Sequence, residues 1–288
     1  MRNQTINRPI DFLILMRFHK PIGAFLLIWP TLWGLWIAAN GTPQVKILSV
    51  FIIGVIIMRA AGCIINDVAD RHFDQYVERT KMRPLTSGKL SLRSALILFA
   101  LLYAIAFSLV CLLNTLTIEL AIAAAAIAIL YPFMKRFTHW PQLILGVAFS
   151  WGIPMAFAAI TNTVPLIAWW LFITSALWTI TYDTEYAMTD RQDDIKIGLK
   201  STAILFGKYD RIIIALLQAL IILSLIGIGI TLKMHWPYFI SVIIATAFFL
   251  YHQQLIAKRD PKSCFKAFLN NNWFGLTIFL GILLSYLL

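Results

Sequence analysis

The apolar residues of the chain fall into long continuous runs separated by short polar stretches. Runs of about 20 apolar residues match a helix that crosses a bilayer, whereas a transmembrane barrel would show segments of about 10 residues with strict alternation. Helices also satisfy their own backbone hydrogen bonds in lipid. The pattern therefore predicts an all-α integral membrane protein with nine transmembrane helices. Their expected ranges are 21–39, 47–65, 92–111, 116–134, 141–160, 165–186, 209–230, 236–254 and 267–287.

Composition supports a membrane protein that forms one domain. Of the 288 residues, 60% are hydrophobic and only 13% are charged, which is more apolar side chain than a soluble core buries. The sequence contains no low-complexity linker and no second soluble domain, so we expect a single transmembrane domain over residues 1–288. Residues 1–20 are basic and partly apolar and no small-residue cleavage site follows them, so we interpret them as an interfacial cytoplasmic arm.

The basic residues are distributed unevenly between alternate loops. The arm and the loops after the second, fourth, sixth and eighth spans carry 4, 6, 2, 5 and 4 of the 24 Lys and Arg residues, while the opposite side has only Lys46 and Lys233. The positive-inside rule therefore places the N-terminus and these loops in the cytoplasm, and an odd number of spans places the C-terminus on the opposite side. The net charge of +11 thus reflects topology. It does not indicate a nucleic-acid partner, and no obligate protein partner is evident.

Acidic residues are rare and concentrated. The chain has 13 Asp and Glu residues, and nine of them lie in residues 67–78 and 183–194, where the second and sixth spans end. If the second helix continues past its span, Asn66, Asp70 and Asp74 stand at positions i, i+4 and i+8 and share one face. The first acidic window, residues 67–78, therefore predicts a row of oxygen ligands at one helix end.

The second acidic window, residues 183–194, repeats this spacing. Asp190 and Asp194 stand at i and i+4, and Asp183 lies two turns earlier on the same side. Stacked like charges repel, so their approach suggests a divalent cation. Oxygen donors without His or Cys select Mg²⁺ or Mn²⁺ over zinc. Glu78, Glu185 and Asp193 fall off the shared faces, and we expect their side chains to point to water. The candidate metal ligands are Asn66, Asp70, Asp74, Asp183, Asp190 and Asp194.

Basic loops follow both acidic windows and the fourth span. Magnesium sites take one or two carboxylates and often phosphate oxygens, so a phosphate-bearing ligand is the natural completion. The segments "ERTKMRPLTSGK", "YPFMKR" and "DIKIGLKSTAILFGK" supply cations close to the acids. The two signs together suit a diphosphate that binds metal on one side and cationic side chains on the other. The candidate cations are Arg79, Arg83, Lys135 and Arg136.

Arg59 lies inside an otherwise apolar span, two turns before Asn66. A charged group at that depth is costly, so it must face the bundle interior and find an anion. The seven-residue offset places it on the same helix face as Asn66, deeper in the bundle. The anion is either a carboxylate of the protein, or of a ligand, and snorkelling to the interface is a further alternative.

Several segments resemble one known family. "NDVADRHFD" is similar to the N-D-x-x-D-x-x-x-D motif of the UbiA superfamily of intramembrane aromatic prenyltransferases. "YDTEYAMTDRQDD" resembles the second aspartate motif of its 4-hydroxybenzoate polyprenyltransferase branch, as do "MRAAGCIINDVAD", "RTKMRPLTSG", "YPFMKRFTHWPQ" and "DIKIGLKSTA". The resemblance runs from the arm through the seventh span in matching order. The last two spans match only in hydropathy.

The resemblance implies a reaction that joins a polyprenyl diphosphate to the ring of 4-hydroxybenzoate, a membrane step toward ubiquinone. It implies nine helices around a central cavity open to membrane lipid, in a bacterial inner membrane with the active site facing the cytoplasm. It also implies Mg²⁺ as cofactor, with Mn²⁺ as a possible substitute. The catalytic residues would be Asp70, Asp74, Asp190 and Asp194, which with Asn66 and Asp183 hold the metal.

The same resemblance assigns the remaining site residues. Arg79, Lys135 and Arg83 would bind the diphosphate, and Arg59 would hold the carboxylate of the aromatic acid. Arg136, next to Lys135, is an alternative partner for either anion. Aromatic faces suit an allylic cation. The candidates are Tyr131, Trp151, Tyr182 and Tyr186.

Two other classes of function stay open at this point. A transporter or channel also uses intramembrane charges, although its site commonly lies near the bilayer midplane and not at helix ends. A prenyltransferase of the same family with another acceptor, such as naphthoate, homogentisate, haem or a sugar phosphate, shares the acidic windows. A scaffold role fits worst, because it gives no reason for nine clustered acids.

Overall fold

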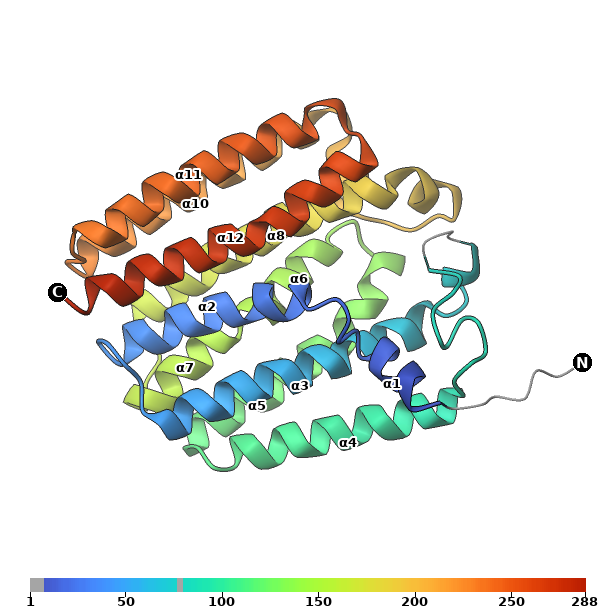
Figure 1. Cartoon of the computed structure of the whole chain (residues 1–288), viewed down its shortest axis with the longest axis horizontal. Helices are drawn as coiled ribbons and strands as arrows, with labels where there is room; N and C mark the ends of the chain where they lie inside the picture. Colours follow the sequence, from blue (N-terminus) through green and yellow to red (C-terminus); the bar gives the residue numbers. More distant parts are fainter. Residues whose placement is uncertain (1–7, 77–79) are drawn as a thin grey trace, which may run out of the picture.

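The computed structural model describes residues 8–76 and 80–288, and every regular element in this part of the chain is a helix. The long helices lie side by side in one bundle (Figure 1). Helix α1 (Pro9–Leu15) and the C-terminal end of α12 (Pro261–Ser285) lie at opposite ends of that bundle (Figure 1). The all-helical class predicted from the sequence is therefore confirmed for the described residues.

The helix starts follow local capping chemistry. Side chains at four N-caps accept a hydrogen bond from the backbone N–H three residues later, which satisfies a donor that the helix itself leaves free. These caps are Ser91, Asn114, Ser201 and Asp260. Between α1 and α12 the α-helices are α2 (Ile22–Ala38), α3 (Val45–Asp70), α4 (Leu92–Val110), α5 (Thr115–Leu130), α6 (Pro141–Ser150), α7 (Gly152–Thr161), α8 (Leu166–Lys196), α9 (Thr202–Phe206), α10 (Asp210–Thr231) and α11 (Trp236–Leu255). Short 3₁₀ helices are η1 (Asp74–Tyr76), η2 (Tyr131–Arg136), η3 (Gly207–Tyr209) and η4 (Ile256–Lys258).

Each expected span contains helical structure, but the helices differ in length and hydropathy, which decide whether a helix can cross a membrane. In the described residues, seven helical stretches are long and apolar enough to do so. Helix α2 has 17 residues and is shorter, and the 31-residue α8, which carries the second acidic window, is not among the seven. The membrane-helical class is thus confirmed, and the count of nine spans stays a prediction.

The span expected over residues 141–160 is present as the apolar stretch Pro141–Thr161, and it consists of two helices. The helix is interrupted at Trp151, between α6 and α7. Pro154 explains the position, because a proline ring clashes with the carbonyl four residues earlier, which here belongs to Ser150, the last residue of α6. The side chain of Trp151 lines the cavity described below.

The bundle has a tightly packed part and an open part. Trp33 of α2 stacks on Trp178 of α8 at 5.2 Å between ring centroids, and Phe274 of α12 completes the cluster. Gly146 brings α6 onto α8 so closely that a Cβ there would lie 2.8 Å from a backbone oxygen. By contrast, only 11% of the apolar window of α4, and of the stretch Thr115–Arg136, is buried inside the protein. These helices form a thin wall.

Glu185 is not the water-facing residue that the sequence suggested. Its side chain is fully buried, and Oε2 accepts a hydrogen bond from Nδ2 of Asn271 at 2.8 Å. Oδ1 of Asn271 in turn accepts from Nε1 of Trp178 at 2.8 Å, while Nδ1 of His252 lies 3.7 Å from Oε1 of Glu185. One side chain of α12 therefore holds two residues of α8 that stand two turns apart, which fixes the rotation of α8.

Replacing Asn271 with Leu should destabilise the protein. The buried carboxyl of Glu185 and the indole of Trp178 would both lose a partner, and an unsatisfied buried polar group costs about 1–3 kcal/mol. We expect a lower midpoint of thermal unfolding, measured by tryptophan fluorescence in detergent. The matched control is Glu185→Gln, whose amide oxygen still accepts from Asn271 and whose midpoint should stay close to wild type. An Asn271→Leu protein that unfolds at the wild-type temperature would contradict this role.

Candidate active site

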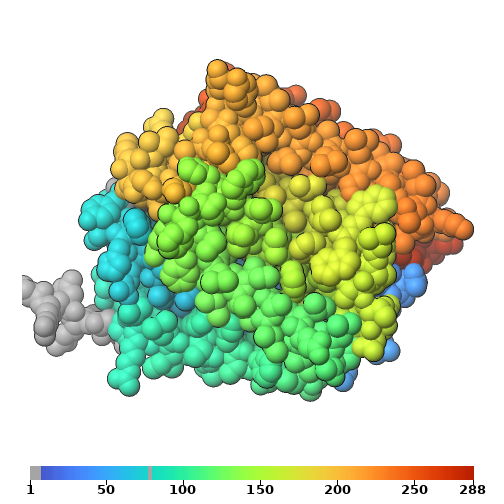
Figure 2. Space-filling model, turned by 180° about the vertical axis from the view of Figure 1, so that it is seen from behind, coloured from blue at the N-terminus to red at the C-terminus, as the bar shows by residue number. Residues whose placement is uncertain are grey.

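A single cavity of about 630 Å³ brings together most of the residues selected from the sequence. Its deep part is apolar, with walls that include Leu26, Phe51 and Phe149, and its polar part lies where α3 and α8 carry the acidic windows. In Figure 2, α4 to α8 lie below the orange atoms of the C-terminal helices, and blue atoms of the N-terminal third are visible between the green ones. The predicted site residues that line the cavity are Arg59, Asn66, Asp70, Asp74, Arg83, Tyr131, Lys135, Asp183, Asp190 and Asp194.

The second span does not continue as an α-helix to Asp74, which corrects one sequence expectation. Helix α3 ends at Asp70, the chain turns tightly with a bond of 2.8 Å from Phe73 N to Asp70 O, and Asp74 begins η1. Thr80 Oγ1 donates to the carbonyl of Asp74 at 3.0 Å and holds the turn. Asp74 faces the cavity all the same. The shared face therefore comes from a turn and not from one helix.

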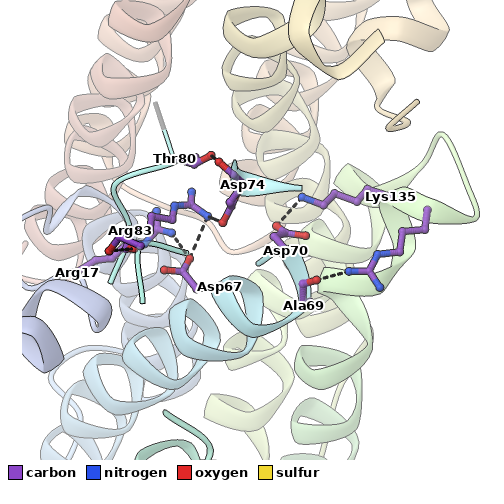
Figure 3. Close-up of polar contacts among 10 residues, drawn as sticks. Arg17, Asp67, Ala69, Asp70, Asp74, Thr80, Arg83 and Lys135 are labelled. Atoms are coloured by element: carbon purple, nitrogen blue, oxygen red, sulfur yellow. Dashed lines mark hydrogen bonds and ion pairs between the residues drawn. The ribbon is translucent and has the colours of Figure 1, made fainter. Parts of the chain in front are cut away.

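Cations neutralise the two acids of the first window that line the cavity (Figure 3). Lys135 Nζ lies 2.5 Å from Asp70 Oδ2, and Arg83 Nη1 lies 2.7 Å from Asp74 Oδ2. Burial raises the pKa of the Asp74 carboxyl; Arg83 opposes this effect, whereas Asp70 adds to it. The carboxylates thus occupy a poorly solvated site in which their charge requires a nearby cation.

Asp67 has a different environment from its neighbours. Its side chain is 2% exposed and is not part of the cavity wall. Oδ1 contacts Nη2 of Arg17 at 2.5 Å and Nη1 of Arg83 at 3.0 Å (Figure 3). Arg17 comes from the segment after α1 and lines the cavity, although sequence reasoning did not select it, because no spacing connects it to residue 67.

The second acidic window keeps the helical geometry that its spacing predicted. Helix α8 runs unbroken to Lys196, and Asp183, Asp190 and Asp194 all line the cavity. Asp193 lies off this face, with its side chain 45% exposed and 3.1 Å from Lys196, as expected for a solvated residue. The two windows therefore meet at one cavity from different helices.

The donor set fits a hard divalent cation that shares its coordination with a ligand. In residues 8–76 and 80–288, no group of three or more His, Cys, Asp and Glu side chains could hold a metal ion. Mg²⁺, however, commonly uses only one or two carboxylates and completes its shell with water and phosphate oxygens. Asp70 supports such a site, because its Oδ1 atom is buried and has no hydrogen-bond partner in the described structure. A buried carboxylate oxygen of this kind is a natural metal ligand.

Arg59 lies in the cavity wall without a carboxylate partner from the described residues, whose ion pairs involve other cations. Its Nη1 atom contacts Sγ of Cys63 one turn further along α3. Gly23 of α2 makes room for the guanidinium, because a Cβ there would lie 2.6 Å from Nε of Arg59. Among the described residues, Arg59 therefore forms no internal ion pair.

Two predicted cations stand apart from the cavity. Arg136 donates from Nη2 to the carbonyl of Ala69, and its guanidinium lies over the rings of Phe73 and Phe133 at 5.2 and 5.4 Å. It is not among the residues that line the cavity, so its suggested contact with a substrate anion stays a prediction without structural support. Arg79, like Glu78, lies outside the described residues.

Aromatic side chains complete the wall. Trp151 and the three tyrosines named from the sequence, Tyr131, Tyr182 and Tyr186, all line the cavity. Tyr186 also packs on Phe268 of α12, which contributes to the wall although the last spans carry no motif. Lys200, a cation of the loop segment "DIKIGLKSTAILFGK", also lines the cavity, and further wall residues that the sequence did not indicate are Lys20, Gly23, Thr80, Gln142 and Phe265.

Comparisons with known proteins agree with this geometry. The 4-hydroxybenzoate octaprenyltransferase of Coxiella burnetii is 58% identical over 275 residues, which cover 96% of each chain. The protein of the same name from Citrobacter koseri is 55% identical over 282 residues, or 98% of each chain.

Solved structures share the fold. A UbiA homologue from Aeropyrum pernix K1 superposes with a TM-score of 0.79 at 25% identity, covering 90% of this chain and 97% of that one. A UbiA homologue from Archaeoglobus fulgidus, solved with GPP and Mg²⁺, gives 0.71 at 18% identity over 94% and 99%. The model of the UbiA prenyltransferase family matches residues 27–280. With most of its length matched, the chain belongs to the UbiA prenyltransferase family.

Proposed function

We propose that the protein transfers a polyprenyl group from polyprenyl diphosphate to the ring of 4-hydroxybenzoate and releases diphosphate, as a membrane step of ubiquinone biosynthesis. The observation that carries this proposal is one cavity in which both acidic windows, several cations and an unpaired Arg59 meet an apolar interior. The names of the relatives at 55% and 58% identity support the same reaction. We keep a same-family enzyme with another acceptor as the alternative.

A divalent cation, with Mg²⁺ first and Mn²⁺ as a substitute, fits the acidic end of the cavity. Its proposed ligands are the six oxygen-bearing residues of the two windows, and when bound it supplies Lewis-acid stabilisation of a departing diphosphate. The family neighbours bound to Mg²⁺ and to Cd²⁺ support the use of a divalent ion. The ligands are Asn66, Asp70, Asp74, Asp183, Asp190 and Asp194.

Lys135 and Arg83 are the described cations best placed for the diphosphate. Each contacts a carboxylate of the first window, at 2.5 and 2.7 Å, so each lies beside any anion that binds there. Arg79 is a further proposed contact from the same loop. Charge-assisted bonds from preorganised cations gain strength as negative charge develops on the leaving group.

The remainder of the cavity suits the organic chemistry of the transfer. When the bond between the allylic carbon and the diphosphate oxygen breaks, the electron pair leaves with the oxygen and the carbon becomes electron-poor. The faces of Tyr131, Tyr182, Tyr186 and Trp151 line the space where this positive charge is stabilised. The ring carbon beside the phenolic oxygen then forms the new carbon–carbon bond and loses a proton. The apolar wall excludes water, which would otherwise capture the cation.

The environment of Arg59 suits the carboxylate of the acceptor. A half-buried guanidinium without an anion among the described residues has an unmet electrostatic requirement, and a benzoate carboxylate meets it with a charge-assisted bond. Such a contact would hold the ring in the cavity below the acidic end. This argument favours an aromatic acid over acceptors that lack a carboxylate.

The topology proposal joins the charge distribution to the structure. We infer nine spans. To the seven apolar stretches we add α2, which is short, and α8, which is polar near its end, because both helices pack in the core of the bundle. The N-terminus and the acidic end of the cavity face the cytoplasm, the C-terminus faces the opposite side, and the membrane is the bacterial inner membrane.

Activity is tested with purified protein, Mg²⁺, 4-hydroxybenzoate and a mixture of prenyl diphosphates, followed by mass spectrometry of the products. Wild-type protein should yield prenylated acid, while Asp70→Asn and Asp190→Asn should lose most activity, because an anionic ligand is removed with little change in volume. Asp193→Asn is the matched control and should keep it. No product with any donor overturns the reaction, and full activity of Asp70→Asn across a Mg²⁺ titration overturns the metal site.

Arg59→Ala should weaken use of the acid selectively. A hydrogen bond to a charged partner contributes about 1.5–3 kcal/mol, which corresponds to about a tenfold to hundredfold rise in KM for 4-hydroxybenzoate. The KM for the prenyl diphosphate should stay at its wild-type value, and Arg59→Lys should recover part of the loss. Steady-state kinetics with each substrate varied in turn measures both constants. A rise confined to the diphosphate KM would assign Arg59 to the other substrate.

Topology is tested by cysteine accessibility in intact cells, in a background with Cys111→Ser. Lys89 and Gln44 are exposed in loops at opposite ends of α3, so each position tolerates a probe. An impermeant thiol reagent should label Gln44→Cys and spare Lys89→Cys until the membrane is opened. The reverse labelling pattern would invert the orientation.

A further inference from the structure

Asp67 has the properties of a structural anion more than those of a metal ligand. It is the most buried of the described acids of the first window, it does not line the cavity, and its Oδ1 atom already contacts two guanidinium groups. Asp70, one turn later, has the opposite character, with one oxygen bound to Lys135 and the other unpartnered. Neighbouring acids of one motif therefore have different tasks.

The reason lies in the two faces of α3. Ile64 and Asp67 stand three residues apart and face the N-terminal arm, where Leu15 packs in the same apolar cluster as Ile64. Asn66 and Asp70 stand four residues apart and face the cavity. The arm is thus docked on α3 by one apolar contact and one ion pair.

The backbone after α1 delivers Arg17 to this place. The chain turns at the end of the helix, with Arg17 N bonded to Ile14 O at 3.0 Å and Phe18 N to Leu13 O at 3.2 Å. Arg17 adopts a left-handed conformation with φ of 58°, which a residue with a side chain rarely takes without stabilising contacts. The 2.5 Å pair with Asp67 supplies such a contact, and it holds the guanidinium at the cavity wall.

The geometry of this cluster suits a ligand with several phosphate oxygens. Arg17 and Arg83 contact the same oxygen of Asp67, so their guanidinium groups are adjacent (Figure 3). Each guanidinium has five N–H donors in a planar fork that matches phosphate oxygens. Arg83 also contacts Asp74, which places the pair of arginines beside the proposed metal ligands.

We propose that Arg17, carried by the N-terminal arm, binds the diphosphate of the donor together with Arg83, and that Asp67 is a positioning residue for both arginines and not a metal ligand. The proposal rests on the proposed function and names a further residue for it. It also gives the arm a role in the reaction site.

The experiment measures binding of geranyl diphosphate with Mg²⁺ by calorimetry in detergent, without acceptor. Arg17→Ala and Asp67→Asn should each weaken binding about tenfold, as expected for loss of one charge-assisted contact. The double variant should bind no more weakly than the weaker single variant, because the two residues act as one unit. Arg17→Lys should recover part of the affinity, and Arg8→Ala, on the exposed start of the arm, should bind like wild type.

Two further readouts separate positioning from a general structural effect. The Mg²⁺ concentration for half-maximal activity should be unchanged in Asp67→Asn and raised in Asp70→Asn. The KM for 4-hydroxybenzoate should be unchanged in Arg17→Ala, and thermal unfolding should show that each variant is folded. If Asp67→Asn does not fold, Arg17→Ala and Arg17→Lys decide the question.

Three results would overturn the proposal. They are wild-type affinity for geranyl diphosphate in folded Arg17→Ala, a raised Mg²⁺ requirement in Asp67→Asn equal to that of Asp70→Asn, and a rise in the KM of the acid alone in Arg17→Ala. Because the titration contains no acceptor, protein that binds the diphosphate normally but prenylates no 4-hydroxybenzoate refutes the proposed function and leaves this assignment standing.

Discussion

The cost of placing charge in a low-dielectric bundle governs this structure. A buried carboxylate or guanidinium is tolerated only with a partner of opposite sign or a good hydrogen bond, and breaking a buried pair by removing one member is strongly destabilising. Asp67, Asp70 and Asp74 meet this condition with cations from the arm, the loop after α3 and η2. Segments far apart in the sequence are therefore drawn to one end of the bundle. Arg59 lines the cavity without an anionic partner among the described residues, so the same requirement favours an anionic ligand beside it.

The architecture separates rigidity from access. Helices α2, α8 and α12 form a core of stacked aromatic rings, and Asn271 fixes the rotation of α8 by contacts to Trp178 and Glu185. The opposite face of α8 carries the acids of the second window into the cavity. Helix α12 has no sequence motif, but it holds α8, the helix that carries the second acidic window. These acids therefore project into the cavity from a rigidly held helix, and fixed charges of this kind suit the stabilisation of a developing charge.

The class of the protein followed from the sequence, and most of the residues selected from it lie at one cavity. The apolar runs, the i, i+4 spacing of Asp190 and Asp194 and the rarity of acids leave few other solutions. The errors have a common physical cause. Glu185 was expected in water because helical spacing says nothing about what packs on the other face of α8. Arg17 was missed because its place depends on a turn after α1 and a distant partner. The span over residues 141–160 was predicted correctly, but its division at Trp151 depends on Pro154, which an apolar run does not reveal.

The thin wall formed by α4 and α5 has a consequence for how the protein responds to its surroundings. Since little of either helix is buried against the rest of the chain, the lipid tails supply much of the packing that holds them in place. The core of aromatic rings is held by contacts within the protein, whereas the cavity wall of α4 and α5 depends on contacts with lipid. Bilayer thickness and acyl-chain order therefore act directly on the shape of the cavity, and lipid composition becomes a physical variable of the reaction itself.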